Sequence, residues 1–260
     1  MAKIISVHSF RGGTGKSNTT ANIAFILASK GLRVGVIDTD IQSPGIHVLF
    51  GLQEDDMKHS LNDYLWGKVD VKDTALDVTD KLGKDMPGKV LVIPKEAHLY
   101  LIPSSMKAGE IARVLREGYD VGLLNDGFHA LVEDLNLDVL MIDTHPGLNE
   151  ETLLSIAISD ALAIIMRPDS QDYQGTAVTV EVARKLDVPN MVLVVNKVPQ
   201  SFNIDEVKAR VEKTYNAEVA AVFPHSDEMM TLASSAIFAL RYPDHPFTKT
   251  YQTLANRLMA

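Results

Sequence analysis

One glycine-rich run in the chain contains the residue types that bind polyphosphates. It reads Phe-Arg-Gly-Gly-Thr-Gly-Lys-Ser and occupies residues 10–17. Its glycines are Gly12, Gly13 and Gly15. Glycine adopts backbone angles that other residues avoid, so successive N–H groups of such a run can turn inward onto phosphate oxygens. The run follows an apolar segment, residues 3–9, and precedes a helical pattern, which puts the phosphates at the positive end of a helix.

The last residues of this run predict how a nucleoside triphosphate and its metal ion would be held. Lys16 is expected to neutralise the β- and γ-phosphates, and the hydroxyl of Ser17 is expected to bind Mg²⁺. Thr14 and Asn18 complete the expected cradle. The ordinary pattern requires a glycine at position 10, where this chain has Phe10. The run is therefore a variant of the common phosphate-binding loop.

Acidic residues follow two apolar segments that are expected to lie beside this loop. The first segment, residues 33–38, ends in Asp38 and is followed closely by Asp40. Both carboxylates are expected to face the γ-phosphate, where such groups orient the attacking water and order the adjoining loop. The alternative is structural, with the pair ending a strand and capping a turn. The second segment, residues 139–143, delivers Asp143, which is expected to contact Mg²⁺ through water.

After the second acidic segment the chain is expected to turn sharply, within Thr144-His145-Pro146-Gly147. Glycine adapts its backbone readily, so Gly147 suits a segment that changes when a γ-phosphate is present. His145 is interpreted first as a turn residue and second as a participant in catalysis.

Apolar runs that alternate with helical patterns set the fold class. Besides residues 3–9, the expected strands are 33–38, 90–93, 99–102, 139–143, 161–166, 191–195 and 219–223. The expected helices are 18–30, 107–118, 121–136, 150–158, 173–187, 205–214, 228–240 and 247–259. Such alternation predicts an α/β fold with a doubly wound, mostly parallel sheet flanked by helices, whose ligand lies beyond the carboxyl ends of the strands. Residues 51–89 are expected to form a surface excursion that includes a short helix at 61–66.

The bulk composition limits the classes of protein to consider. With 260 residues, 46% of them hydrophobic, the chain is expected to form a single P-loop domain over residues 1–260. It shows neither a signal-peptide pattern nor an apolar run near the length of a membrane span, so a cytoplasmic protein is expected. It has no cysteine, which excludes disulfides and thiolate-held metal clusters.

A series of motifs in the same order resembles the ParA/MinD family of ATPases, whose Walker A loop is of a deviant form. The motifs are the glycine-rich loop, Val36–Asp40, Leu99–Ser105, Leu140–Gly147, Ser159–Ala161 and Asn196-Lys197. The resemblance extends over nearly the whole chain. It implies an ATPase that forms a homodimer with ATP held between the subunits, binds a surface as a dimer, and is released when a partner protein stimulates hydrolysis.

Arg11 stands where the family carries a signature lysine that reaches across the dimer to the partner's nucleotide. Arg11 either reaches a phosphate of the partner with its bidentate guanidinium or lies near the interface while another basic residue contacts the partner's nucleotide. Loss of the lysine is similar to McdA, the ParA-type ATPases that space carboxysomes over the bacterial nucleoid. This narrower resemblance implies a nucleoid-associated protein whose partners are nonspecific DNA and an McdB-like activator.

Recognition of the base is expected from the far half of the sheet. The resemblance implies that Asn196, which follows the segment 191–195, hydrogen-bonds the base. Pro224 and His225 are expected to run beside the base and to contribute backbone groups only. Val198-Pro199 stands where a guanine reader would supply an acid, which favours adenine and therefore ATP.

The C-terminal part of the chain predicts which surface the dimer binds. The last expected helix has an apolar stripe made of Phe247, Tyr251, Leu254 and Leu258. Because the helix has only two basic residues, this stripe is expected to dock on the core rather than lie in a membrane. The stretch from Met229 onward is net positive within a chain of net charge −9. It supplies the candidates for a sequence-independent DNA footprint, which are Arg241, Lys249 and Arg257.

Two other classes of function stay open beside a DNA-surface positioning ATPase. One is a MinD-like, membrane-associated regulator of the division site. The other is a small-molecule P-loop enzyme, such as a ligase that resembles dethiobiotin synthetase. Retention on DNA with ATP, retention on anionic liposomes, or turnover that requires a small-molecule acceptor distinguishes the three.

Overall fold

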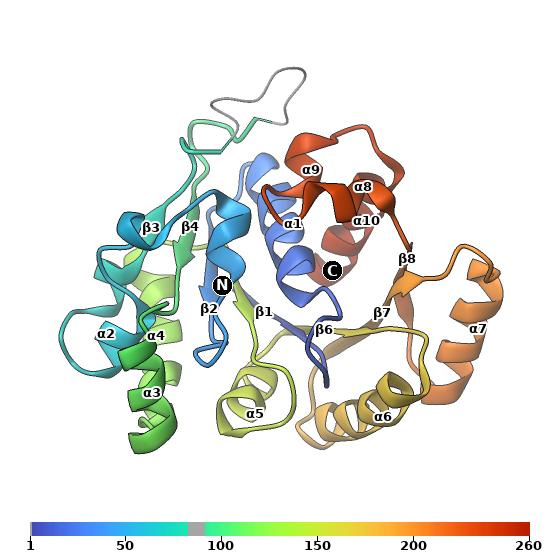
Figure 1. The fold of residues 1–260 in the computed structure, drawn as a ribbon, viewed down its shortest axis with the longest axis horizontal. Coiled ribbons are helices and arrows are strands. Elements are labelled where there is room, and N and C mark those ends of the chain that lie inside the picture. The colour runs from blue at the N-terminus through green and yellow to red at the C-terminus, as the bar shows by residue number, and fades with distance from the viewer. Residues whose placement is uncertain (1, 83–91) are drawn as a thin grey trace.

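In the part of the chain that the structure describes, eight strands form one sheet in the order β3-β4-β2-β5-β1-β6-β7-β8 (Figure 1). The structure is a computed structural model, and it describes residues 2–82 and 92–260. Neighbouring strands run parallel, except that β3 pairs antiparallel with β4. The strands are β1 (Lys3–His8), β2 (Val34–Asp38), β3 (Leu76–Asp77), β4 (Leu99–Ile102), β5 (Val139–Asp143), β6 (Ala161–Met166), β7 (Asn190–Val198) and β8 (Val219–Pro224).

Helices cover both faces of the sheet (Figure 1). The helices are α1 (Lys16–Ser29), α2 (Leu61–Leu65), α3 (Ala108–Glu117), α4 (Val121–Asp134), α5 (Glu150–Ala157), α6 (Ser170–Lys185), α7 (Ile204–Tyr215), α8 (Asp227–Leu232), α9 (Phe238–Arg241) and α10 (Pro246–Met259). Helices α1, α9 and α10 pack on one face, and α4 to α7 lie on the other. This arrangement confirms the predicted α/β class with a doubly wound, mostly parallel sheet.

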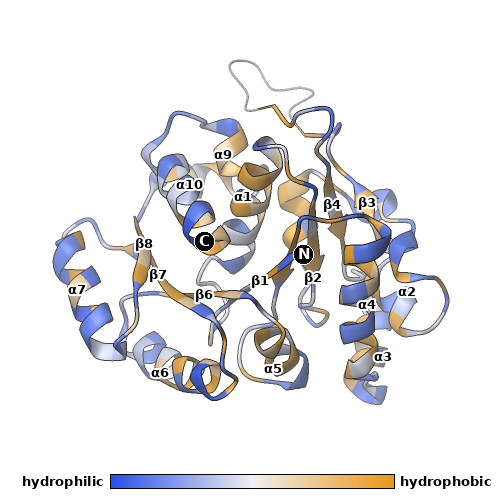
Figure 2. Cartoon of the chain, turned by 180° about the vertical axis from the view of Figure 1, so that it is seen from behind, coloured by the Kyte–Doolittle hydropathy of each residue, from blue (hydrophilic) through white to orange (hydrophobic). Residues whose placement is uncertain are grey.

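The central strands are mostly apolar because each of their faces contributes to a core. In β1, Ile5 and Val7 belong to the core under α1 and α10, whereas Ile4 belongs to the core under α4. A strand that is covered on both sides has no solvent-facing position, so it shows no alternation of apolar and polar residues. Figure 2 shows the result, with apolar strands at the centre and polar residues on the outer sides of α6 and α7.

The sheet register brings the predicted site segments to one edge. Within the pairing of β5 with its two neighbours, Asp143 stands opposite Val7 of β1 and opposite Asp38 of β2. The carboxyl ends of these three parallel strands therefore lie side by side. The loops that leave them meet beyond the sheet, where ligands of doubly wound folds bind.

The helix predicted at 228–240 is broken, and this prediction is wrong. Helix α8 ends at Leu232, and Ala233 and Ser234 then take left-handed angles, with φ of 48° and 59°. The turn allows the whole of α9 to approach α1, where the backbone N–H of Ala239 donates to Oδ1 of Asn22 at 2.7 Å. Burial of Ile237 and the first residues of α9 in the core thus overrides the helical pattern of the sequence.

The surface excursion predicted for residues 51–89 is also wrong in part; its residues 83–89 lie outside the described ranges. Leu52 and Val78 are buried in the core under α1 and α10, and Leu61, Leu65 and Val71 are buried in the core under α4, on the other face of the sheet. The predicted short helix is α2, and the strand β3 in this segment was not predicted.

The strand predicted at 90–93 lies half outside the described residues, and Val92 and Ile93 are not in a strand. The other predicted strands and helices are present, with small differences at their ends. Among the helices of the described residues, none has both the length and the apolar character that crossing a membrane requires.

Candidate nucleotide site

The loop between β1 and α1 has the geometry of a phosphate cradle. Gly13 and Gly15 take left-handed angles, with φ of 74° and 103°, whereas the φ of Gly12 is not positive. Helix α1 begins at Lys16, and no side chain caps its first turn. The N–H groups at the start of α1 therefore point to the loop without a side-chain acceptor, which is the arrangement that binds anions at helix N-termini.

The two unusual residues at the start of this loop lie against helix α6. The ring of Phe10 packs on Gly175, where a Cβ atom would come within 2.2 Å of the ring atom Cδ1. Arg11 donates from Nη1 to Oε1 of Gln171, and the same nitrogen lies 3.7 Å from Oδ1 of Asp172. Helix α6 thus accommodates both departures from the common loop sequence. No pattern in the sequence pointed to these contacts.

Two buried carboxylates face each other beside Lys16. Asp38 and Asp143 are each 1% exposed and occupy opposite positions in the β2–β5 register. Burial raises the pKa of Asp38 well above its usual value, and the nearby carboxylates of Asp143 and Asp40 raise it further. Burial also raises the pKa of Asp143, against the opposing effects of Lys16 and of the hydroxyls of Ser17 and Thr20. Two such carboxylates require a cation beside them if both are to be ionised.

The oxygen atoms of this group fit Mg²⁺. Carboxylate and hydroxyl oxygens are hard ligands, and Asp143 and Ser17 provide one of each within the site. In the described ranges, no three His, Cys, Asp or Glu side chains are grouped so that they could hold a metal ion by themselves. A magnesium ion here would complete its coordination with phosphate and water oxygens, as is usual for this metal in nucleotide sites.

Asp40 is bonded to both of the loops that follow β2 and β5. Its Oδ1 accepts hydrogen bonds from Oγ of Ser43 at 2.9 Å and from Nδ1 of His145 at 2.7 Å. Burial alone would raise the pKa of Asp40, but His145, Ser43 and Lys16 outweigh it and hold the pKa below its usual value. Asp40 is therefore an ionised acceptor, whereas its neighbour Asp38 is driven toward the neutral form.

Further hydrogen bonds fasten these loops to each other and to β1. The N–H and the hydroxyl of Thr39 both donate to the backbone O of Asp143, at 3.0 and 3.1 Å. The hydroxyl of Thr144 donates to the backbone O of Val7 at 3.1 Å and lies 2.7 Å from Nδ1 of His8. Since this hydroxyl already donates to Val7, Nδ1 of His8 is the donor in the second bond.

His8 is a buried histidine that the motif analysis did not single out. Its side chain is inaccessible to solvent, and burial, with Lys16 and His145 nearby, lowers its pKa to about 3. Its Nε2 atom has no hydrogen-bond partner among the described residues. His8 is thus a neutral ring that holds Thr144 in place.

A pocket of about 440 Å³ lies beside the loop at the end of β7. It brings together the residues predicted to lie beside the base, which are Asn196, Pro224 and His225, with Gly15 and Asn18 of the predicted cradle. Its apolar walls include Met229, Met230, Phe247 and Tyr251, which the sequence analysis did not assign to the site. The two methionines lie in α8, and the other two belong to the stripe of α10.

Asn196 makes contacts other than the one that the resemblance implied. Its Nδ2 donates to the backbone O of Thr14, and its Oδ1 accepts from the N–H of Lys197, both at 2.8 Å. Nζ of Lys197 donates to the backbone O of Gly13, also at 2.8 Å. A Cβ atom on Gly15 would come within 2.3 Å of Nδ2 of Asn196. In this structure the amide fastens β7 to the phosphate loop, and its role toward the base stays a prediction.

The three predicted DNA contacts come from different parts of the C-terminal region. Arg241 is in α9, and its guanidinium lies 6.0 Å from the centre of the Tyr242 ring. Lys249 lies in the first turn of α10 and Arg257 in the last, about 12 Å apart along the helix. Arg257 is paired with Glu218, with 2.7 Å between Nη2 and Oε2.

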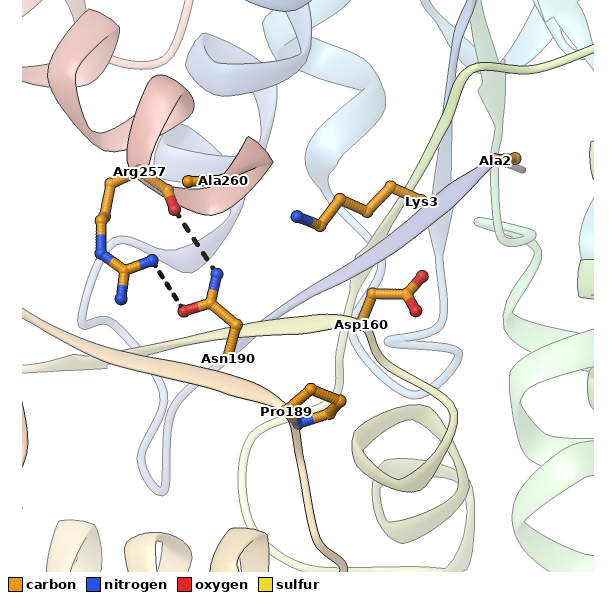
Figure 3. A pocket seen from close by; sticks show the side chains of 7 residues that line it. All are labelled: Ala2, Lys3, Asp160, Pro189, Asn190, Arg257 and Ala260. Atoms are coloured by element: carbon orange, nitrogen blue, oxygen red, sulfur yellow. Dashed lines mark hydrogen bonds between the residues drawn. The ribbon is translucent and has the colours of Figure 1, made fainter.

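A cavity of about 620 Å³ surrounds Arg257 at the amino ends of the strands (Figure 3). Three of its polar side chains are bonded within the protein, since Arg257 donates to Oδ1 of Asn190 at 2.9 Å and Asp160 accepts from the N–H of Ile4 at 2.8 Å. This edge of the sheet is opposite to the one that carries the phosphate loop. The cavity is therefore separate from the nucleotide site.

Comparisons with known proteins agree with this geometry. The sequence model of the ParA family, described as NUBPL iron-transfer P-loop NTPase, matches residues 1–259. An uncharacterised ATP-binding protein of Methanocaldococcus jannaschii is 28% identical over 260 residues, which are 100% of this chain and 88% of that protein.

Solved structures share the fold at lower identity. The cell division protein MinD of Aquifex aeolicus is 20% identical with a TM-score of 0.77, over 99% of this chain and 97% of that one. The apo McdA of Cyanothece is 16% identical with a TM-score of 0.74, over 100% of both chains. Because the family match covers almost every residue and the phosphate loop is formed, the chain belongs to the ParA/MinD family of P-loop ATPases.

Proposed function

We propose that this ATPase is a nucleotide switch that forms a homodimer around ATP and Mg²⁺, binds DNA without sequence preference as a dimer, and positions a cellular cargo. One observation carries the proposal. The loop after β2 is hydrogen-bonded to the loop after β5, and the loop after β5 is hydrogen-bonded to β1, the strand that precedes the phosphate loop. Through these contacts a γ-phosphate between the loops would affect all of them at once. Such loops are typical of proteins that change partners when their nucleotide is hydrolysed.

Each group of the site has a task in hydrolysis. The N–H groups of the loop and the buried charge of Lys16 bind the phosphates, and Mg²⁺, when bound, would supply further positive charge against the charge that develops on them. Ser17 and Asp143 would hold this ion. Asp38 and Asp40 orient the attacking water and order the loop that contains them. In support of the second task, Asp38 accepts the N–H groups of Asp40 and Gly45, at 3.0 and 3.3 Å.

Arg11 is the candidate for contact with the partner's nucleotide. Its side chain is 40% exposed and is attached to α6 through Gln171 and Asp172. The contacts are polar, and the buried carboxylate of Asp172 also pairs with Arg167 at 3.1 Å, so it keeps a partner when Arg11 leaves. Arg11 can therefore exchange them for a phosphate of a second subunit without loss of buried packing. We infer that Arg11 takes the place of the family's signature lysine.

The surface that the dimer binds is inferred from α10. Its stripe, made of Phe247, Tyr251, Leu254 and Leu258, is buried in the core, as predicted. The helix therefore does not present an apolar face to a membrane, which favours DNA over the MinD-like alternative. Since Glu218 balances Arg257, the footprint rests chiefly on Arg241 and Lys249. Carboxysomes as the cargo, an McdB-like activator and a place on the nucleoid rest on the similarity to McdA alone.

Iron transfer is the function that the description of the family model suggests. The chain has no cysteine, and thiolates are the usual ligands of iron–sulfur clusters. We therefore propose a switch rather than a carrier of such clusters.

The proposal is tested by retention of the purified protein on two surfaces. Beads carrying random-sequence duplex DNA and anionic liposomes are each incubated with the protein and ATP, ADP or no nucleotide. The Asp38→Ala variant, expected to bind ATP without hydrolysing it, serves as the trapped form. Retention on DNA with ATP alone, stronger for the variant, supports the proposal. Retention on liposomes instead supports a membrane regulator, and retention on neither surface contradicts a surface-binding switch.

A further inference from the structure

His145 makes a contact that a residue serving only in a turn does not require. Its Nδ1 lies 2.7 Å from Oδ1 of Asp40, and the two side chains are only 19% and 12% exposed. The residues are far apart in the sequence and follow the ends of two adjacent strands, β5 and β2. A carboxylate only accepts hydrogen bonds, so Nδ1 of His145 carries the proton and donates it.

Among the described residues, the hydrogen bond from His145 is the side-chain bond that ties Asp40 to the loop after β5. The two bonds from Thr39, one from its N–H and one from its hydroxyl, both end on the backbone O of Asp143 and do not involve the carboxylate of Asp40. The bonds from Ser43 to Asp40 come from three residues away and belong to the same loop. The direction of this carboxylate relative to the other loop therefore depends on His145.

The backbone of His145 is itself anchored. Its carbonyl O accepts a hydrogen bond from the hydroxyl of Thr152 at 3.3 Å, and Thr152 is inaccessible to solvent. The side chain of Asn149 caps the same helix, α5, by accepting the N–H of Thr152 at 2.9 Å. His145 thus connects Asp40 to a helix in the core and not to a free loop.

We propose that His145 is a positioning residue for ATP hydrolysis, holding the carboxylate of Asp40 in the orientation from which it orders the attacking water. The inference rests on the role proposed above for Asp40. It adds that the loop after β5 sets the position of this acid, so that the two loops become competent for hydrolysis together. Binding of ATP, which depends on Lys16 and the loop N–H groups, does not require the contact.

The test compares His145→Ala with His145→Asn, because Nδ2 of asparagine can occupy nearly the position of Nδ1 of histidine. We expect kcat for ATP hydrolysis to fall by about tenfold to a hundredfold in His145→Ala, since small misplacements of a positioning group have effects of this size. We expect His145→Asn to recover most of the loss. The dissociation constant for a fluorescent ATP analogue should change by less than about threefold in either variant. His129→Ala, on the exposed side of α4, is the matched control.

A double-mutant cycle with Asp40→Ala completes the test. If His145 acts through Asp40, removing both side chains should lower kcat no further than removing Asp40 alone. Equal loss in His145→Ala and His145→Asn, or additive effects in the cycle, would overturn the proposal. So would a wild-type kcat in His145→Ala when Asp40→Ala is inactive. Full turnover by Asp40→Ala would instead remove the role of Asp40 in the proposed function, on which the inference rests.

Discussion

At the scale of single residues, the site combines one buried cation with two buried carboxylates. Lys16 is 7% exposed, and Asp38 and Asp143 are each 1% exposed. Buried carboxylates with raised pKa values are costly to keep ionised in the nucleotide-free protein. A nucleotide bound with Mg²⁺ brings both signs of charge to the site. The metal ion would offset the charge of the carboxylates, and the phosphates would offset the charge of Lys16. The group is therefore arranged for a ligand and not for stability of the free protein.

Replacement of Lys16 by alanine should abolish ATP binding. The substitution removes the charge that offsets the β- and γ-phosphates, while the loop glycines and the acids stay in place. Isothermal titration with ATP and Mg²⁺ measures the effect, and a thermal melt checks that the variant folds. A folded variant with unchanged affinity for ATP would contradict the assignment of the phosphate loop.

Replacement of His8 by asparagine should remove a pH dependence of stability. The pKa of His8 is lowered from 6.5 to about 3 by burial, so the unfolded chain binds its proton more readily than the folded protein does. The contribution of neutral His8 to the free energy of unfolding is therefore complete above pH 6.5 and is lost as the pH falls toward 3. At about pH 5.5 the free energy of unfolding should be about 1 to 2 kcal/mol lower than at about pH 8 because of His8.

Asparagine keeps a donor for Thr144 and does not titrate, so it is the matched variant for this experiment. Urea unfolding of the nucleotide-free protein at the two pH values gives the difference for wild type and for His8→Asn. The wild type should lose more stability on acidification than the variant. Equal losses in both proteins would show that His8 is not the titrating group.

At the scale of elements, helix α6 supports the unusual start of the phosphate loop. Phe10 packs on Gly175, and Arg11 bonds to Gln171 near the N-terminus of the helix. Strand β7 supports the end of the loop through Asn196 and Lys197. The loop is thus fastened at both ends by elements that come more than 150 residues later in the chain. These contacts fix the loop before nucleotide binds.

Replacement of Gly175 by alanine should destabilise the protein, because the new Cβ would come within 2.2 Å of Cδ1 of Phe10. The ring must move, and the expected cost is about 1 to 3 kcal/mol. Urea unfolding measures this cost. The second change Phe10→Ala should recover most of it by removing the ring. An unchanged free energy of unfolding in Gly175→Ala, or no recovery of stability in the double variant, would show that Phe10 and helix α6 are not tightly packed at this point.

At the scale of the whole molecule, the sequence predicted the sheet, most helices and the grouping of acids around the loop. These features depend on local patterns and on the rule that parallel strands share their carboxyl ends. The bond between His145 and Asp40 depends on the register of β2 with β5, and no local pattern sets that register. The break after α8 and the burial of apolar residues such as Leu52, Leu61 and Val78 depend on how distant segments pack on the core. Such features follow from tertiary packing, which a single sequence does not display.

DNA binding through the proposed footprint should depend on the salt concentration and on the two exposed cations, Arg241 and Lys249. Each phosphate contact that is lost should reduce the slope of log affinity against log salt by about 0.9. Arg241→Ala and Lys249→Ala should therefore weaken binding of the ATP-bound protein equally on unrelated DNA sequences, while hydrolysis continues. Arg257→Ala should have a smaller effect because Glu218 already balances this charge. An unchanged salt slope in the Arg241→Ala, Lys249→Ala double variant would place the footprint elsewhere.

The proposed conversion of the protein into a dimer by ATP at this site is tested by the molar mass of the Asp38→Ala variant in solution. Light scattering after size-exclusion chromatography gives the mass with ATP and Mg²⁺, with ADP and Mg²⁺, and without nucleotide. We expect twice the monomer mass with ATP and the monomer mass in the other two cases, and Arg11→Ala in the same background should shift the ATP form back toward monomer. A monomer in ATP, under conditions where titration shows that the nucleotide is bound, would contradict the claim.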